Sequence, residues 1–321
     1  MSFSIFFELL PSTLADGLVL GLLYASIALG YTMVYGVLGL INFAHSEIFM
    51  VGAIVAVEVL TYVLLGSGLH PLLQLLFAMT IAAAVAAALA GLAERVAYRP
   101  LRRSNAPKLA PLITAIGISL FLQDAVRFVE SLFGQFIRPF PSIPFFDDMI
   151  QVSSTLSVPM KSVVILVVAG AMLGGLTYTV NRTRLGKAIR AVATDRTAAS
   201  LMGINVNRIV LQTFLIGGAL AGVAGTLYAL QFGRVDPFTG FIPGLKAFTA
   251  AVLGGIGSIP GAMVGGILLG LLEMLIGTFV PLLTDNAIGT EYKDIFAFGI
   301  LILILILKPS GLMGRSSTEK V

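Results

Sequence analysis

Four long stretches without a charged side chain constrain the fold of this sequence more than any other feature. No Asp, Glu, Lys or Arg occurs in residues 17–46, 59–93, 209–233 or 247–272. A helix of about 20 apolar residues is needed to cross the hydrocarbon core of a bilayer. In that core every backbone polar group must be bonded internally, which helices achieve. The chain is therefore expected to be an all-α polytopic membrane protein.

The apolar segments predict about eight to ten transmembrane helices in a single membrane domain over residues 1–321. The chain is 57% hydrophobic and 11% charged, far from the composition of a soluble domain. Our division has nine segments, at residues 14–37, 47–66, 72–94, 109–130, 158–181, 208–231, 241–257, 260–282 and 292–308. Two Gly-rich stretches, 36–46 and 254–261, are expected to be breaks or re-entrant turns. No Lys or Arg precedes the first segment, so it lacks the basic region of a secretory signal.

The distribution of basic residues predicts which side of the membrane each loop faces. Residues 94–108 carry five Lys and Arg, and residues 181–208 carry six of the 20 in the chain. Cytoplasmic loops are enriched in Lys and Arg, so both loops are expected in the cytoplasm. The loop 131–157 is then external. The tail returns to the cytoplasm with Lys308, Arg315 and Lys320.

The basic stretch 181–208 is patterned as two short helices and not as a flexible loop. One apolar helical face is formed by Leu185, Ala188, Ile189 and Val192. Lys187 and Arg190 lie off that face. We interpret the stretch as a docking element for a soluble partner. The alternative is an interfacial helix whose charges only set the topology.

The second short helix has recognisable ends. Thr194 or Asp195 is suited to cap its N-terminus. It is expected to run to Met202, and Gly203 is the expected stop.

Glycines at small-xxx-small spacing predict close helix packing in the membrane. The sets are Gly17 and Gly21; Gly170 and Gly174; Gly218 and Gly222; Gly257, Gly261 and Gly265; Gly266 and Gly270. The strings GLLYA at 21–25 and GTLYA at 225–229 are similar, and each precedes a Gly/Pro-interrupted stretch. They suggest a candidate inverted repeat of the kind found in transporters.

Several charged or polar residues fall in or near the apolar segments: His45, Glu47, Glu58, Asp124, Arg127, Lys246 and Glu273. Such groups are costly in lipid and are usually paired or functional. Asp124 and Arg127, at i and i+3, are expected to pair. Lys246 is suited to snorkel outward. The most polar spot is the break LINFAHSE, with Asn42, His45, Ser46 and Glu47. These residues either line a translocation path or bond the broken backbone.

Other functions lack their sequence signatures. No GxxxxGK[ST] motif is present, so no P-loop ATP site is expected. With no cysteine and two histidines, a metal site is not expected, and neither is another cofactor. No nucleophile stands with a base and an orienting group, so the chain is not expected to be an enzyme. The net charge of +4 arises in membrane-flanking loops and does not indicate nucleic-acid binding.

Five strings in order resemble one family. They are GYTMVYGVLGLINFAHSEIFMVGA at 30–53, ERVAYRPLR at 94–102, LITAIGISLFLQ at 112–123, RLGKAIRAVATDRTAASLMGIN at 184–205, and KAFTAAVLGGIGSIPGAMVGG at 246–266. They resemble the H-type permease subunit of LIV-type, branched-chain amino-acid ABC importers, a type II-like importer permease. Ser46 departs from the family pattern, which commonly has Gly there.

The resemblance implies a multi-pass subunit of the bacterial inner membrane that sits among membrane lipid. The implied partners are a homologous M-type permease, two cytoplasmic ATPases, a periplasmic substrate-binding protein and a small-molecule substrate. It also implies that the cytoplasmic stretch 181–208 is a coupling loop, with residues 184–204 seated in an ATPase cleft. The residues assigned to coupling are Gly186, Lys187, Arg190, Ala191, Asp195 and Gly203. Those assigned to the translocation path are Asn42, His45, Ser46 and Lys246.

Three other functions remain open at this stage. Close relatives in sequence pattern carry urea or short amides by the same ATP-driven route. An ion-coupled secondary transporter would use His45, Glu47, Lys246 and Glu273 and need no ATPase. A membrane scaffold or sensor subunit would move no solute.

Overall fold

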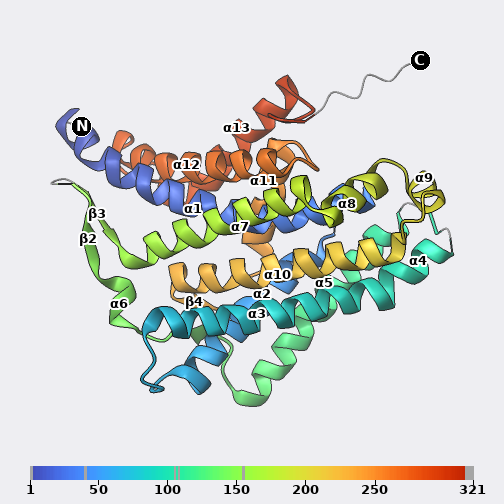
Figure 1. The fold of residues 1–321 in the computed structure, drawn as a ribbon. Helices are drawn as coiled ribbons and strands as arrows, with labels where there is room; N and C mark the ends of the chain where they lie inside the picture. The colour runs from blue at the N-terminus through green and yellow to red at the C-terminus, as the bar shows by residue number, and fades with distance from the viewer. Residues whose placement is uncertain (1–2, 40–41, 105, 108, 154–155, 315–321) are drawn as a thin grey trace. The chain divides into compact units, whose positions relative to one another are not determined.

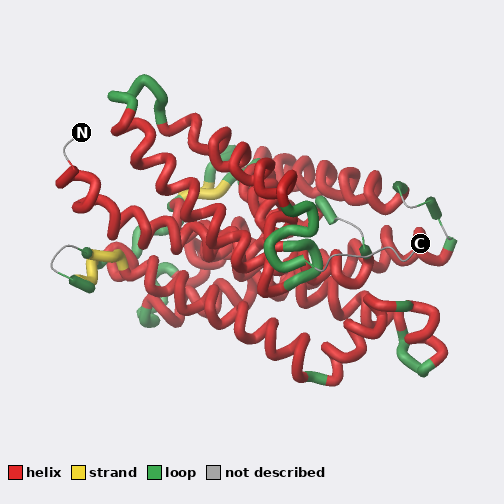
Figure 2. Tube along the Cα trace, turned by 90° about the horizontal axis from the view of Figure 1, so that it is seen from above, coloured by secondary structure: helices red, strands yellow, loops and turns green. Residues whose placement is uncertain are grey.

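The computed structural model describes residues 3–39, 42–104, 106–107, 109–153 and 156–314, with side chains from residue 6 onward. Three of the basic residues on which the predicted orientation depends lie outside the described residues: Lys108, Arg315 and Lys320. Helices make up most of the described chain, and short strands form two small pairs (Figure 2). The all-α membrane architecture predicted from the sequence is thus confirmed.

All nine predicted segments coincide with helices (Figure 1). Seven are long and apolar enough to cross a membrane. They are built from α1 (Phe3–Leu38), α2 (Ala44–Val59) with the π-helical turn η1 (Leu60–Leu64), α3 (Pro71–Ala93) with η2 (Glu94–Tyr98) and α4 (Arg99–Arg103), α5 (Ala110–Phe133), α7 (Met160–Arg182), α10 (Val206–Phe232) and α12 (Ile259–Leu283). The other two, α11 (Phe241–Gly254) and α13 (Lys293–Leu307), have 14 and 15 residues. At 1.5 Å per residue they fall short of a core about 30 Å thick.

The chain divides into two compact units that are discontinuous in sequence. Unit 1 contains residues 1–28, 143–171 and 246–321, and unit 2 contains residues 29–142 and 172–245. Unit 1 includes α6 (Pro144–Asp147), η3 (Thr290–Tyr292) and the antiparallel pair β2 (Met149–Gln151) with β3 (Ser157–Pro159). Unit 2 includes α8 (Arg184–Thr194), α9 (Arg196–Leu201) and the pair β1 (Arg138–Pro139) with β4 (Arg234–Val235).

The core of unit 2 is the crossing of α2, α3 and α10, where small residues let the backbones touch. A Cβ placed on Gly222 of α10 would lie 2.5 Å from the carbonyl oxygen of Ala82 in α3. A Cβ on Gly52 of α2 would lie 2.6 Å from the Cα of Gly222. Large apolar side chains such as Phe49 and Phe214 fill the space around this crossing and are fully buried.

In unit 1, small residues also let the backbones touch where α1 crosses α12. A Cβ on Gly21 would lie 2.6 Å from the Cα of Ile267. Gly270 in α12 meets the backbone of Gly21 in return. Gly21 begins the string GLLYA, and Gly225, which begins GTLYA, packs on Phe49 and Ala53 of α2. The two similar strings therefore each supply a glycine to a helix crossing, while the repeat itself stays a prediction.

Three of the predicted packing glycines do not pack within the described chain. A Cβ on Gly170 or Gly174 of α7 would meet nothing within 4 Å. Gly257 also has open space and has φ +89, so it serves the turn between α11 and α12. Spacing alone does not separate these glycines from the others, because it does not tell which helix face meets a neighbour.

The two predicted breaks lie where the sequence placed them. The helix α1 ends at Leu38 and α2 begins at Ala44, so the chain breaks inside the stretch 36–46. The helix α11 ends at Gly254 and α12 begins at Ile259, inside the stretch 254–261. Ser258 caps α12 by accepting a hydrogen bond from the Gly261 N–H (3.1 Å).

Candidate functional site

The basic segment folds as two short helices because each start has its own cap. The Thr183 hydroxyl accepts a hydrogen bond from the Gly186 N–H (3.1 Å), which fixes the first turn of α8 against the end of α7. A Cβ on Gly186 would overlap the carbonyl oxygens of Thr179 and Val180, so only glycine fits this turn. Ile189 and Val192 are buried, which confirms the apolar face predicted for α8.

Asp195 is the cap of the second helix. Its carboxylate accepts hydrogen bonds from the backbone N–H groups of Thr197 (2.7 Å) and Ala198 (3.0 Å). The Thr194 hydroxyl instead donates to the Arg190 carbonyl (2.9 Å). Gly203 has φ +82 just after the helix, where the sequence predicted the stop.

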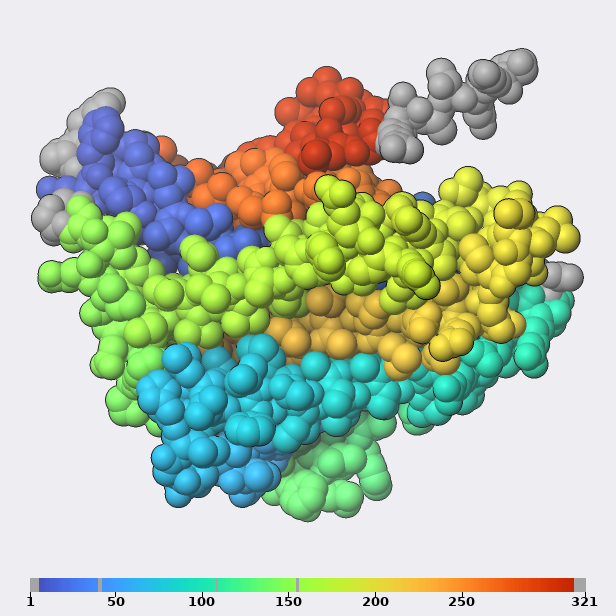
Figure 3. All heavy atoms as spheres, in the orientation of Figure 1, coloured from blue at the N-terminus to red at the C-terminus, as the bar shows by residue number. Residues whose placement is uncertain are grey.

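The outward side of this segment is exposed and carries both charge and apolar surface. Lys187 and Asp195 are exposed, while Ala191 is half-buried. The Arg190 guanidinium donates to the Val180 carbonyl, so this side chain also braces α8 against α7. At the far end Leu201 and Met202 are 84% and 82% exposed. We call residues 184–202 the α8–α9 segment; it projects at one end of unit 2 (Figure 3, yellow-green to yellow).

Arg196 connects the α8–α9 segment directly to the end of α1. Its guanidinium donates to the carbonyls of Val37 (3.0 Å) and Leu38 (2.7 Å), which have no partner further along the helix. A cation at a helix C-terminus also complements the helix dipole. Burial, and then the positive charge of Arg102, lower the pKa of Arg196 from its ordinary value. The bonded residues are separated by 159 and 158 positions, and no sequence pattern pointed to them.

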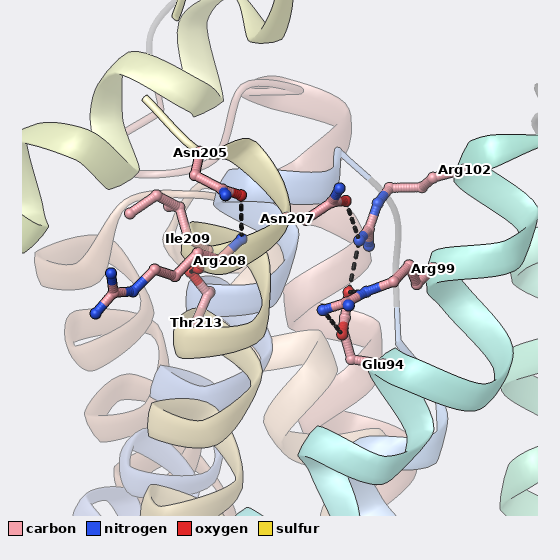
Figure 4. Close-up of polar contacts among 8 residues, drawn as sticks. All are labelled: Glu94, Arg99, Arg102, Asn205, Asn207, Arg208, Ile209 and Thr213. Carbon is pink, nitrogen blue, oxygen red and sulfur yellow. Dashed lines mark hydrogen bonds and ion pairs between the residues drawn. The ribbon is translucent and has the colours of Figure 1, made fainter. Parts of the chain in front are cut away.

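A buried carboxylate organises the second basic loop (Figure 4). Glu94 has a fully buried side chain and receives Arg102 (2.5 Å) and Arg99 (3.2 Å). Arg102 also donates to Asn207 near the start of α10 (3.3 Å), next to the Asn205 side chain that caps this helix. Both basic loops therefore meet at one end of unit 2, in agreement with the prediction that they face the same side of the membrane.

The polar break between α1 and α2 is mostly engaged in local bonds. Asn42 is buried, and its Oδ1 accepts hydrogen bonds from the Tyr98 hydroxyl (2.7 Å) and the Ala44 N–H (3.2 Å). The Ser46 hydroxyl donates to the Phe43 carbonyl (2.8 Å). His45 is buried with its ring 4.8 Å from that of Tyr31. For Asn42 and Ser46, these contacts favour the reading in which polar side chains bond the broken backbone.

Glu47 differs from its neighbours in the break. Its side chain is 1% exposed, and Oε1 accepts a hydrogen bond from the Ser119 hydroxyl (3.4 Å). Its other oxygen, Oε2, has no hydrogen-bond partner among the described residues. It faces the backbone of Gly240, where a Cβ would lie 2.8 Å away. A buried carboxylate oxygen without a donor is costly unless a cation or a donor reaches it.

Lys246 lies in an ion cluster within unit 1. Its Nζ bonds Glu273 (2.9 Å) and Asp294 (2.7 Å), and Lys293 also reaches Glu273 (2.9 Å). The Tyr24 hydroxyl donates to the second oxygen of Glu273 (2.9 Å). Lys246 is 6% exposed, so the expectation that it snorkels outward was wrong. Two acceptors within the same unit already bind its ammonium group.

Two further charged residues of the apolar segments form ion pairs, one of them predicted from the sequence. Asp124 and Arg127 form the predicted i,i+3 pair (3.1 Å) on an exposed face of α5. Glu58 pairs with Arg138 of β1 (2.9 Å).

A family model described as the permease component of branched-chain amino acid transport systems matches residues 13–305. The chain belongs to this family. The permease is 45% identical over 318 residues to the high-affinity branched-chain amino acid transport system permease protein BraD of Pseudomonas aeruginosa, covering 96% of the chain and 97% of the relative. It is 44% identical over 310 residues to the corresponding protein LivH of Escherichia coli K12, covering 95% and 96%. No solved structure matches the chain.

Family membership makes the chain a multi-pass permease subunit of the inner membrane and not an enzyme. The α8–α9 segment and the Glu47 site lie on its unit 2. Helical periodicity and capping residues predicted the first of these. The roles of Arg196 and Glu94 were not predicted, because the partners of Arg196 are distant in sequence and those of Glu94 belong to a charge cluster that indicates only a basic loop.

Proposed function

We propose that this permease is the membrane subunit of an ABC importer that moves branched-chain amino acids inward, driven by ATP hydrolysis on partner chains. The chain acts as one permease domain, with residues 181–208 as its cytoplasmic coupling loop. The observation that carries the proposal is the α8–α9 segment. It is a capped, rigid element with a buried apolar face and an exposed outer side, and it bonds to the end of a membrane helix through Arg196.

Coupling through this segment has a direct physical route. Leu201 and Met202 present apolar surface that water does not favour, which suits the core of a protein interface. Lys187 and Asp195 add charge at its rim, and Gly186 and Arg190 keep α8 fixed to α7. When an ATPase moves the segment, Arg196 pulls on the last carbonyls of α1, just before the polar break. The movement of α1 is then transmitted to the polar break and to α2.

The proposed translocation path runs beside that break. Glu47 supports this assignment because its unbonded oxygen suits the α-ammonium of an amino acid. His45 precedes it by two residues and is buried at the same break. Asn42 and Ser46 hold the backbone of the break in place.

Lys246 is assigned differently in this proposal. Its contacts support a positioning role within unit 1. The ion-coupled alternative needs Lys246 and Glu273 to exchange protons or ions, and their mutual pairing speaks against that use.

The finer assembly is a prediction from resemblance. A homologous M-type permease, two ATPases and a periplasmic binding protein complete the importer. Purification from gently solubilised native membranes, followed by mass spectrometry, is expected to recover two ATPases and a second permease. Recovery of the chain alone, under conditions that keep other ABC complexes intact, would refute the assembly.

A matched pair of variants tests the coupling role. Leu201→Glu with Met202→Glu is expected to abolish recovery of the ATPases and leucine uptake, while insertion and thermal stability stay as in wild type. The control Leu109→Glu changes another exposed leucine, 68% exposed and outside the segment. Equal ATPase recovery in both variants would contradict docking through α9.

A further inference from the structure

A pocket lies at the end of α10 away from the α8–α9 segment. The helix has 27 residues and is about 40 Å long at 1.5 Å per residue, enough to separate the two faces of a bilayer. The pocket has a volume of about 500 Å³, in the range of small-molecule sites. Five of its eight lining residues are aromatic or aliphatic, among them Phe232, Phe238 and Ile242. Its two charged side chains are Arg234 and Asp236.

The backbone of Arg234 is fixed in a strand pair, while its charged side chain has no partner in the described part of the chain. It pairs with Pro139 in the β1–β4 ladder, and the Phe140 N–H donates to the Gly233 carbonyl (2.9 Å). Its guanidinium is exposed and has no ion pair or hydrogen bond among the described residues. An unpaired guanidinium beside aromatic walls, on a backbone that is held in place, is suited to bind a carboxylate through two parallel hydrogen bonds.

The strand that supports Arg234 is itself anchored by a buried ion cluster. Arg138 of β1 is 6% exposed and bonds Glu130 (2.7 Å), Glu58 (2.9 Å) and Gln135 (2.7 Å). Burial alone would lower the pKa of Arg138. The hydrogen bond to Glu130 and the charges of Glu130 and Glu58 outweigh this and raise that pKa above its ordinary value. The wall that carries Arg234 therefore has a firm support.

Asp236 is oriented by a tight turn. Its Oδ1 accepts a hydrogen bond from the Phe238 N–H (2.7 Å), and its own N–H donates to the Thr239 hydroxyl (2.8 Å). No cation pairs with Asp236 among the described residues. The second carboxylate oxygen remains available to a ligand. The pocket thus combines one open cation, one open anion and apolar walls.

We propose that this pocket is an entry site for an amino-acid zwitterion on the external side of the permease. Arg234 binds the α-carboxylate, Asp236 binds the α-ammonium, and the aromatic walls cover an aliphatic side chain. The inference rests on the proposed function, because it takes an imported amino acid as the ligand. The external position follows from α10, whose other end carries the basic cytoplasmic loop.

The pocket also adjoins the proposed path. Thr239 lines the pocket, and the next residue, Gly240, packs on the unbonded Oε2 of Glu47. One short loop therefore forms the pocket wall on one side and covers a buried carboxylate on the other. A movement of this loop would open Glu47 to an ammonium group already bound at Asp236.

Fluorescence of one introduced tryptophan measures occupancy of the pocket directly. The chain has no tryptophan, so Phe232→Trp places a single reporter in the wall. The full-length chain in lipid nanodiscs is titrated with L-leucine, with L-leucinamide, which lacks the carboxylate, and with 4-methylpentanoate, which lacks the ammonium. Leucine is expected to give a saturable change at millimolar concentration. Each analogue is expected to bind about tenfold more weakly, since it loses one charge-assisted contact.

Variants assign each contact to its residue. On the reporter background, Arg234→Gln is expected to make leucine and leucinamide bind alike. Asp236→Asn is expected to make leucine and 4-methylpentanoate bind alike. The control Arg127→Gln removes a nearby cation that lies over the Phe238 ring but is already paired with Asp124. It is expected to leave the preference for leucine unchanged. A preference that persists in both test variants would overturn the proposal.

Uptake by cells carrying the whole transporter separates this proposal from the proposed function. If wild type takes up no leucine, the proposed function fails. If wild type takes up leucine and both variants match it, the pocket proposal fails alone. If the variants lose uptake but wild type gives no fluorescence response to leucine, the pocket contacts a macromolecular partner instead, and the substrate site is overturned. Support requires both a leucine response and reduced uptake in the variants.

Discussion

A methyl group added at Gly222 tests whether backbone contact holds the core of unit 2 together. In Gly222→Ala the new Cβ would lie 2.5 Å from the Ala82 carbonyl oxygen and 2.7 Å from the Ala83 Cα, where ordinary contact begins at 3.4 Å. The helices α3 and α10 must then separate by up to about 0.9 Å, because backbone atoms cannot rotate away as side chains do. Overpacking of this kind costs about 1–3 kcal/mol. Alanine returns up to about 1 kcal/mol through helix propensity.

The chain offers a matched control in Gly174→Ala. This is the same substitution in a membrane-spanning helix of the same unit, but its Cβ meets nothing within 4 Å. It is expected to be neutral or stabilising. Heating of detergent-solubilised, fluorescently tagged protein, followed by size-exclusion chromatography, gives an apparent midpoint for each variant. Gly222→Ala is expected to lower it by several degrees relative to Gly174→Ala. Equal midpoints would refute the argument that backbone contact sets this crossing.

Three further predictions concern the ion pairs and the tie to α1. Arg196→Gln is expected to lower leucine uptake about tenfold without loss of ATPase binding. Each charge-assisted hydrogen bond that it removes contributes about 1.5–3 kcal/mol, and the partial exposure of Arg196 reduces this contribution. The control is Arg184→Gln, at an exposed residue of the same segment, and equal uptake by the two variants would contradict the role of Arg196. Glu94→Gln leaves two arginines without their anion and is expected to cost about 3 kcal/mol, read as a lower thermal midpoint. Lys246→Met is expected to lower the thermal stability of unit 1, and the double variant Lys246→Met with Glu273→Gln is expected to recover part of that stability. A double variant no more stable than the single one would exclude a direct pairing effect.

The sequence predicted features that depend on neighbouring residues. The caps and stop of α9 follow from Asp195 and Gly203, because a capping bond spans two or three positions. The membrane-spanning helices could be predicted because membrane depth imposes long, mostly apolar segments. The site was harder to predict. Lys246 was expected to snorkel, since nothing near it in sequence indicates Glu273 or Asp294, which are 27 and 48 positions away. The open charges of Arg234 and Asp236 become visible only after β4 is paired with β1.

The discontinuity of unit 1 has a consequence for how the protein is made. Residues up to 28 are synthesised before the rest of unit 1, and they belong to the same unit as the segment from Lys246 onward. The face of α1 that carries Gly21 packs on Ile267 and Gly270, so it must wait in the bilayer until α12, far later in the chain, has been synthesised. Unit 2, which ends at residue 245, is complete earlier. A nascent chain that stops before α12 would leave a close-packing surface exposed to lipid, where membrane proteases can recognise it as an orphan.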